Sequence, residues 1–167
     1  MKIQSKYIIT LISLLFATTL INAQSVEQLK AKAKKYDPAA RLYLGLLYQE
    51  GKRVEQNDSL AAYWFQKAAN QGLAEAQVLL GNCYREGRGV KKDTLKAFEL
   101  YEMAAGCDAS LAMDALGDCY YYGIAVQRDV IRARYYYNLA AKKGYKKAKI
   151  KYDKIRFKKD EDEIINL

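Results

Sequence analysis

The chain has 167 residues and a formal net charge of +9 at pH 7, from 28 lysine and arginine residues against 19 aspartate and glutamate residues. It contains no histidine, which excludes serine–histidine and cysteine–histidine nucleophile pairs and every histidine-bearing metal site. Its single proline and its wealth of alanine, leucine, lysine and glutamate favour a helical protein, and no low-complexity linker indicates a second domain.

Residues 1–23 are predicted to form a secretory signal peptide. Lys2 and Lys6 give a basic start, and residues 7–21 form an apolar run that is short for a membrane span. Ala23 supplies a small residue at the cleavage point, where no cysteine is present to carry a lipid. An uncleaved membrane anchor is the alternative. We expect an exported bacterial protein, periplasmic or secreted, with no transmembrane segment after cleavage.

Residues 24–37 are predicted to form an N-terminal capping helix, and three units then repeat one another at a spacing of 36 residues. The units are residues 38–73, 74–109 and 110–145. The positions in register include Leu44-Gly45, Leu80-Gly81 and Leu116-Gly117; Tyr48, Tyr84 and Tyr120; Gly51, Gly87 and Gly123; and Ala68-Ala69, Ala104-Ala105 and Ala140-Ala141. A fixed period of this length predicts stacked units, each burying its apolar face only against its neighbours.

The second unit predicts a pair of antiparallel helices. Apolar residues recur at helical spacing over 74–86, and Gly87 ends this first helix. Gly81 costs about 1 kcal/mol against alanine inside a helix, so its recurrence implies close approach of a neighbouring helix. Asp93 is the predicted N-cap of the second helix, and Asp129 and Asn57 hold the same place in the other units.

These residues resemble the Sel-one-like repeat (SLR) family, a relative of the tetratricopeptide repeats. In the second unit the family's pattern is carried by Ala76, Leu80-Gly81, Tyr84, Gly87, Gly89-Val90, Asp93, Ala97 and Ala104-Ala105. The resemblance covers about residues 38–148. It implies an all-α fold, an α-α superhelix built as a right-handed solenoid of helix-turn-helix repeats, and a role as an adaptor that assembles complexes.

The chain departs from the family's pattern at three loop positions and at its end. Arg53 and Ala125 replace the second loop glycine, so those turns are expected to differ in shape, and Asp108 replaces a glycine in the left-handed region. Residues 146–167 are predicted to form a basic closing helix with an acidic tail, because Tyr152-Asp153 stands where the Leu-Gly pair is expected.

The resemblance also implies a partner-binding groove. The related tetratricopeptide repeats bind ligands along first-helix residues that flank the Leu-Gly and Tyr positions. In this chain those positions are Leu42, Leu46, Gln49, Glu50, Glu75, Val78, Asn82, Arg85, Glu86, Asp114, Asp118, Tyr121 and Tyr122. Five are acidic and one is basic, which predicts a net negative groove. Ordinary solvated helix faces are the alternative.

The positive charge is concentrated at the C-terminal end. Residues 24–127 hold 13 basic and 13 acidic residues, whereas residues 128–159 hold 13 basic residues against two acidic ones. The candidate basic patch comprises Lys142, Lys143, Lys146, Lys147, Lys149 and Lys151. Such a patch attracts anionic partners. Export disfavours nucleic acid, which leaves an anionic envelope polymer, a membrane surface, or the acidic groove of a second copy; a solvated cap is the alternative.

The cysteines and serines give no sign of catalysis. Cys83 and Cys119 share one repeat position and are interpreted as small buried hydrophobes, with a disulfide as the alternative, while Cys107 at a helix end is the expected exposed thiol. No serine opens a Ser-x-x-Lys motif, and no base accompanies Cys107. We therefore expect a non-catalytic scaffold that binds a protein or peptide, with no cofactor and no metal. The alternative is an envelope-associated protein that binds anionic polymer or membrane through the basic patch.

Overall fold

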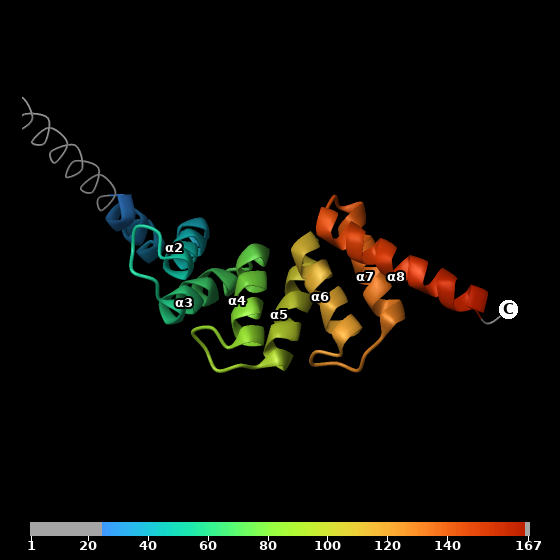
Figure 1. The fold of residues 1–167 in the computed structure, drawn as a ribbon. Coiled ribbons are helices and arrows are strands. Elements are labelled where there is room, and N and C mark those ends of the chain that lie inside the picture. Colours follow the sequence, from blue (N-terminus) through green and yellow to red (C-terminus); the bar gives the residue numbers. More distant parts are fainter. Residues whose placement is uncertain (1–24, 166–167) are drawn as a thin grey trace, which may run out of the picture.

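The computed structural model describes residues 25–165, and every regular element in that range is an α-helix (Figure 1). A helix over 25–34 comes first, within the range 24–37 of the predicted N-terminal capping helix. The helices that follow are α2 (Pro38–Glu50), α3 (Asp58–Ala69), α4 (Ala74–Glu86), α5 (Thr94–Gly106), α6 (Ser110–Tyr122), α7 (Val130–Lys142) and α8 (Lys146–Ile165). The predicted all-α class is confirmed. The predicted signal peptide lies outside the described residues.

The helices pack as a stack of hairpins. α2 packs on α3, α4 on α5 and α6 on α7, and each second helix also packs on the first helix of the next unit, up to α8. Figure 1 shows the hairpins following one another along an elongated molecule. α4 also contacts α6 directly, so first helices of neighbouring units lie side by side. This arrangement is the solenoid that the repeat predicts.

The helix ends follow from single residues at matching positions. The side chains of Asn57, Asp93 and Asp129 accept hydrogen bonds from backbone N–H groups at 2.9, 3.0 and 2.9 Å, which confirms the predicted N-caps. The first helices end at Gly51, Gly87 and Gly123, with φ of 66°, 74° and 69°.

The glycine inside each first helix permits contact with an aromatic ring of the second helix. A Cβ on Gly81 would lie 2.5 Å from the Tyr101 ring, and a Cβ on Gly117 would lie 2.5 Å from the Tyr137 ring. Phe65 packs against Gly45 in the same way. The predicted close approach is confirmed, and the neighbour is an aromatic side chain.

The prediction that the loops at Arg53 and Ala125 differ in shape is wrong. Both residues adopt the left-handed conformation, with φ of 64° and 65°, close to the 70° of Gly89. The repeat geometry therefore imposes one turn on three different residue types, and the two non-glycine residues bear the strain. Asp108, at φ 65°, adopts the left-handed conformation predicted for it.

The cysteines occupy the predicted environments. Cys83 and Cys119 are buried, Cys107 is exposed, and none of the three forms a disulfide. Burial raises the pKa of the Cys119 thiol to about 11 and raises that of Cys83 as well. Both thiols therefore serve as small core side chains.

Candidate functional site

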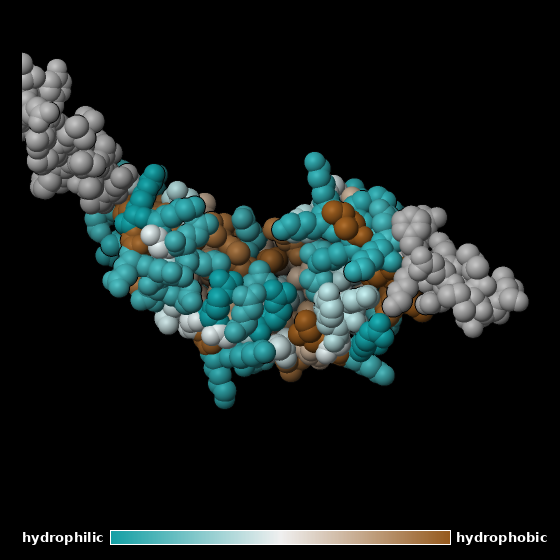
Figure 2. All heavy atoms as spheres, in the orientation of Figure 1, coloured by the Kyte–Doolittle hydropathy of each residue, from teal (hydrophilic) through white to brown (hydrophobic). Residues whose placement is uncertain are grey.

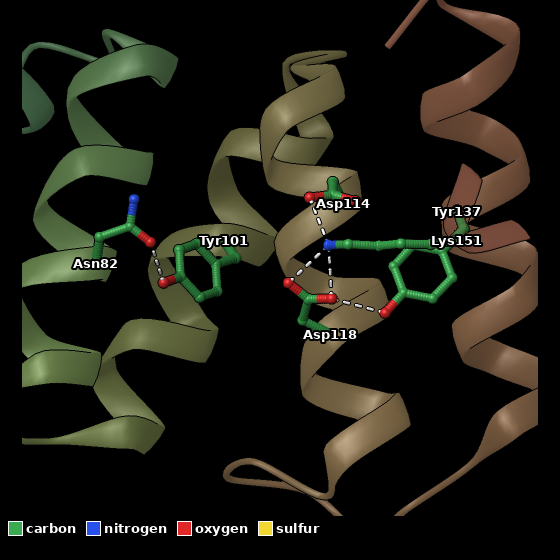
Figure 3. A network of polar contacts seen from close by, with 6 residues as sticks. All are labelled: Asn82, Tyr101, Asp114, Asp118, Tyr137 and Lys151. Carbon is green, nitrogen blue, oxygen red and sulfur yellow. Dashed lines mark hydrogen bonds and ion pairs between the residues drawn. The ribbon is translucent and has the colours of Figure 1, made fainter. Parts of the chain in front are cut away.

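A stripe of polar side chains crosses the face formed by α4, α6 and α8. It consists of Asn82 and Arg85 on α4, Asp114 and Asp118 on α6, and Lys151 on α8, and we call it the polar stripe. Two tyrosines of the second helices contact it through their hydroxyls, Tyr101 at Asn82 and Tyr137 at Asp118 (Figure 3). The stripe unites four of the predicted groove residues with one residue of the predicted basic patch.

The Tyr101 hydroxyl fixes Asn82. It donates to Oδ1 of Asn82 at 2.8 Å, and the Tyr101 ring is fully buried against Gly81. Because Oδ1 is engaged, the amide group of Asn82 is held in one orientation. Its Nδ2 has no hydrogen-bond partner among the described residues and remains as a donor on the stripe.

Lys151 joins the two carboxylates of α6. Its Nζ lies 2.9 Å from Oδ2 of Asp114 and 2.7 Å from Oδ1 of Asp118. Asp118 also accepts from the Tyr137 hydroxyl at 2.7 Å. Asp114 is only 9% exposed, and its Oδ1 has no hydrogen-bond partner in the described part of the chain. These contacts fasten α8 to α6.

At both Asp114 and Lys151, burial shifts the pKa in one direction and the neighbouring opposite charges shift it in the other. Burial raises the pKa of Asp114, and the Lys151 ammonium only partly offsets that rise. Burial alone would lower the pKa of Lys151, but its hydrogen bonds to Asp118 and Asp114 raise it overall. Burial and the Asp118 carboxylate raise the pKa of the Tyr137 hydroxyl, which therefore stays protonated and donates.

Three of the remaining groove residues are apolar and do not face a partner, because Val78 is buried in the core and Leu42 and Leu46 pack against the core. The charged residues at the helix ends are paired locally. Glu86 accepts from Arg85 at 2.8 Å and from Arg88 at 2.7 Å, and Glu50 pairs with Lys52 at 2.8 Å. Gln49, which holds the repeat position of Arg85, has a buried Oε1 without a partner in the described chain.

Two tyrosines extend this face at the end of α6. Tyr121 is half-buried and Tyr122 is 67% exposed, and their rings meet edge to face at 4.9 Å between centroids. The guanidinium of Arg128 lies 5.7 Å from the Tyr121 ring centroid. An exposed aromatic next to polar groups is the kind of side chain that anchors protein contacts.

The six lysines of the predicted basic patch do not act alike. Lys151 belongs to the polar stripe, Lys143 pairs with Asp108 at 2.8 Å, and Lys149 pairs with Asp153 at 2.7 Å. The other three, Lys142, Lys146 and Lys147, are exposed and form no ion pair within the part of the chain whose side chains the structure describes.

Lys151 contacts Asp114 and Asp118 in the polar stripe, whereas the sequence predicts it as part of the basic patch. The sequence places it in a lysine-rich helix, where one ammonium group cannot be told from the next. The sequence does carry one signal of the polar stripe. The second-helix position that holds Phe65 in the first unit holds Tyr101 and Tyr137 in the next two. The position directly after the Leu-Gly pair changes in parallel, from Leu46 to Asn82 and Asp118. A hydroxyl thus appears only where an acceptor appears with it.

The comparisons with known proteins give the family. The Sel1 repeat model matches three segments, residues 38–73, 74–107 and 110–145. The chain belongs to the Sel1 repeat family. Sel1 repeat proteins are generally non-catalytic scaffolds for protein interaction. No functionally curated protein shows significant similarity to this chain.

Solved structures of Sel1 repeat proteins match most of this chain. A protective antigen of uropathogenic Escherichia coli strains is 35% identical over 74% of the chain, with a TM-score of 0.71. A Sel1 repeat protein from Oxalobacter formigenes is 38% identical over 78% of the chain and 98% of its own, with a TM-score of 0.68. The chain spans only 26% of the E. coli antigen. Cysteine-rich protein B of Helicobacter pylori shares the fold, with 23% identity, 74% and 93% of the two chains covered, and a TM-score of 0.58.

The described part of this Sel1 repeat protein has neither a membrane-spanning helix nor a cluster of metal-ligating side chains. No helix within residues 25–165 combines the length and the apolar character that a membrane span needs. In the same range no group of three or more cysteine, aspartate and glutamate side chains is arranged to hold a metal ion.

Proposed function

We propose that the chain is an exported, non-catalytic adaptor that binds a protein or peptide partner through the polar stripe. The observation that carries this proposal is the alignment of Asn82, Asp118 and Lys151 on one face formed by α4, α6 and α8 (Figure 3). Arg85 of α4 lies close enough to Asp118 to interact with its charge. The family's general use as interaction scaffolds supports the class of partner.

The stripe is prepared for binding because its side chains are already held. Tyr101 fixes Asn82, and Tyr137 and Lys151 fix Asp118, so a partner would not have to order them. The Asn82 amide supplies donors, and the carboxylate of Asp118 supplies acceptors, which suits the backbone of an extended peptide.

The export part of the proposal rests on residues 1–23. Their basic start, short apolar run and small residue at Ala23 are the features of a signal peptide. N-terminal sequencing of the protein recovered from the cell envelope tests this part, and we expect the mature chain to begin at Gln24.

The binding part is tested by comparing three double variants in a capture experiment from envelope extract. Arg85→Ala with Tyr122→Ala alters the stripe face. Tyr63→Ala with Lys67→Ala removes a matched tyrosine and cation from α3, where the Lys67 ammonium lies 5.3 Å from the Tyr63 ring centroid. A discrete protein that is lost only with the first variant supports the proposal, and its retention by that variant contradicts it.

The third variant, Lys146→Glu with Lys147→Glu, addresses the alternative of an anionic partner. These two lysines are exposed and free of ion pairs in the part of the chain whose side chains are described. Loss of the captured material only with this variant, together with strong dependence on salt, would replace the stripe by the basic patch as the binding surface.

A further inference from the structure

The junctions between units of the stack differ in what fills them. At the first junction, the buried Arg41 bridges the helix over 25–34 and α3. Its Nε donates to the Ala33 carbonyl at 3.0 Å, and its Nη1 donates to the Lys67 carbonyl at 3.3 Å and to Gln71 Oε1 at 2.8 Å. The guanidinium also lies 4.8 Å from the centroid of the Tyr36 ring. Arg41 is 8% exposed, so this junction is filled by a guanidinium and a tyrosine ring.

The second junction lacks both of those groups. One repeat further along, Gly72 stands at the position of Tyr36, and Gln77 stands at the position of Arg41. No atom lies within 4 Å of a Cβ placed on Gly72. A hollow of about 480 Å³ opens here between α3, α4 and α5, lined by residues that include Gly72, Gln77, Ala69 and Met103. Ala69 and Met103 hold the positions of Ala33 and Lys67, whose carbonyls bind Arg41.

The third junction is occupied in another way. Met113 takes the position of Arg41 and Gln77 and is buried. Asp108, at the position of Tyr36, pairs with Lys143 at 2.8 Å across the same edge. Of these three junctions, only the second is thus left open. Figure 2 shows the surface hollowed in the region where Figure 1 places α4 and α5, with hydrophobic residues at the base.

Gln77, which lines the hollow, carries a buried acceptor without a donor among the described residues. Gln77 is 3% exposed, and its Oε1 has no hydrogen-bond partner in the described chain. An unsatisfied buried polar atom is unfavourable, and a donor that enters the hollow would relieve this cost. The Glu99 carboxylate adds negative charge to the lining. Lys96 is the one basic residue of the lining, and its ammonium lies 4.4 Å from the centroid of the Tyr84 ring.

We propose that the α3–α5 hollow binds an arginine side chain of a protein partner. The guanidinium takes the place that Arg41 fills at the first junction, donating to Gln77 Oε1 and to the carbonyls of Ala69 and Met103. These carbonyls lie in the last turns of α3 and α5. The Ala69 carbonyl accepts from the Gly72 N–H at 2.9 Å and keeps a second lone pair, just as the Ala33 carbonyl accepts from both Tyr36 and Arg41. Leu100 and Met103 pack against the methylene stem. The five N–H groups of a planar guanidinium match several acceptors at once, which a lysine ammonium does not.

This site is separate from the polar stripe and goes beyond the proposed function. The test is a titration of the full ¹⁵N-labelled chain with N-acetyl-arginine amide, followed by NMR. We expect saturable shifts of the Gly72 backbone amide and the Gln77 side-chain amide at millimolar ligand. The uncharged citrulline counterpart and N-acetyl-lysine amide should bind at least about fivefold more weakly. No shift at these signals, or equal shifts with the three ligands, would overturn the proposal.

Two variants at one position sharpen the test. Gln77→Met installs the residue that the third unit carries at this position, so the fold is retained while the acceptor is removed, and arginine-induced shifts should disappear. Gln77→Arg supplies the guanidinium from within the chain, which should abolish binding of the ligand and raise Tm by about 3 °C. Undiminished binding by either variant contradicts the proposal. Because the titration needs no partner protein, its outcome does not depend on the polar stripe.

Discussion

The hydroxyl of Tyr137 donates a hydrogen bond of 2.7 Å to Oδ1 of Asp118, joining the two helices of the third repeat. Tyr101 and Asn82 make the same contact in the second repeat at 2.8 Å. In the first repeat both partners are apolar, Phe65 and Leu46. The hydroxyl and its acceptor are thus present together or absent together, as expected when an unpaired buried hydroxyl is costly.

This pairing predicts the outcome of converting the first repeat. Phe65→Tyr alone should lower the free energy of unfolding by about 1–3 kcal/mol, because the buried hydroxyl meets Leu46 and finds no acceptor. Adding Leu46→Asn should recover about 1 kcal/mol of that loss. Urea denaturation of the two single variants and the double variant measures the coupling, and strictly additive effects would contradict the account.

The close contact between Gly81 and Tyr101 predicts a strong effect of a single methyl group. Gly81→Ala places a Cβ 2.5 Å from the ring, and the overpacking should cost about 1–3 kcal/mol despite the better helix propensity of alanine. Gly106→Ala is the matched control, since no atom lies within 4 Å of its Cβ position in α5. The control should be neutral or stabilising, and equal losses in the two variants would contradict the packing argument.

The ion pairs of Lys151 predict a pH-dependent loss of stability. Lys151→Met leaves Asp114 and Asp118 without their cation and should cost about 2 kcal/mol at pH 7. The cost should shrink near pH 4, because the pKa of Asp114 is already raised by burial and rises further without the ammonium. A carboxyl with a raised pKa stabilises the fold below its ordinary pKa, and that contribution is lost as pH rises through the raised value.

The control for this prediction is Lys149→Met on the same helix. Lys149 pairs with Asp153 on the surface, with 60% of its side chain exposed, so its loss should change stability by no more than about 0.5 kcal/mol at either pH. Chemical denaturation of both variants at pH 7 and pH 4 decides the matter. A cost for Lys151→Met that does not depend on pH would count against the carboxylate cluster.

The strained turn at Ala125 predicts a stabilising substitution. Ala125 has φ of 65°, a conformation that costs an L-residue about 1–2 kcal/mol, whereas the matching Gly89 bears no such cost. Ala125→Gly should therefore raise the free energy of unfolding by up to about 1 kcal/mol, after the entropy of glycine is subtracted. Gly89→Ala should destabilise, because its Cβ would overlap the backbone of Asp58. A drop in Tm for Ala125→Gly would contradict the strain.

The three cysteines should differ in reactivity. Cys107 is exposed, whereas burial raises the pKa of Cys119 to about 11 and also raises that of Cys83. At pH 8 we expect iodoacetamide to modify one thiol of the native protein and three thiols in denaturant, as counted by mass spectrometry. Rapid modification of Cys83 or Cys119 in the native state would show that the core opens there.

The repeat made most of the fold predictable from the sequence. Helix bounds, N-caps and the role of Gly81 follow from local rules, and three in-register copies reinforce each one. The turns at Arg53 and Ala125 were predicted wrongly because residue type alone was considered. Both residues adopt the left-handed conformation of the matching Gly89 all the same.

The candidate site was less predictable, because its contacts join residues distant in sequence. Lys151 reaches Asp118 across 33 positions, and Arg41 reaches Gln71 across 30. No periodicity indicates which of several lysines in α8 turns toward α6. The α3–α5 hollow likewise arises because Gly72 and Gln77 stand at the positions of Tyr36 and Arg41. The sequence does not indicate a cavity there, because only the structure shows that Arg41 fills the first junction.

The central claim is that the face of the first helices is the partner-binding surface. Site-specific photo-crosslinking tests it most directly. A benzophenone side chain replaces Tyr122, which is 67% exposed on α6, or Tyr63, which is 49% exposed on α3. After irradiation in envelope extract, the account predicts one discrete crosslinked protein from position 122 and none from position 63. A crosslink from position 63 alone, or the same protein from both positions, would contradict it.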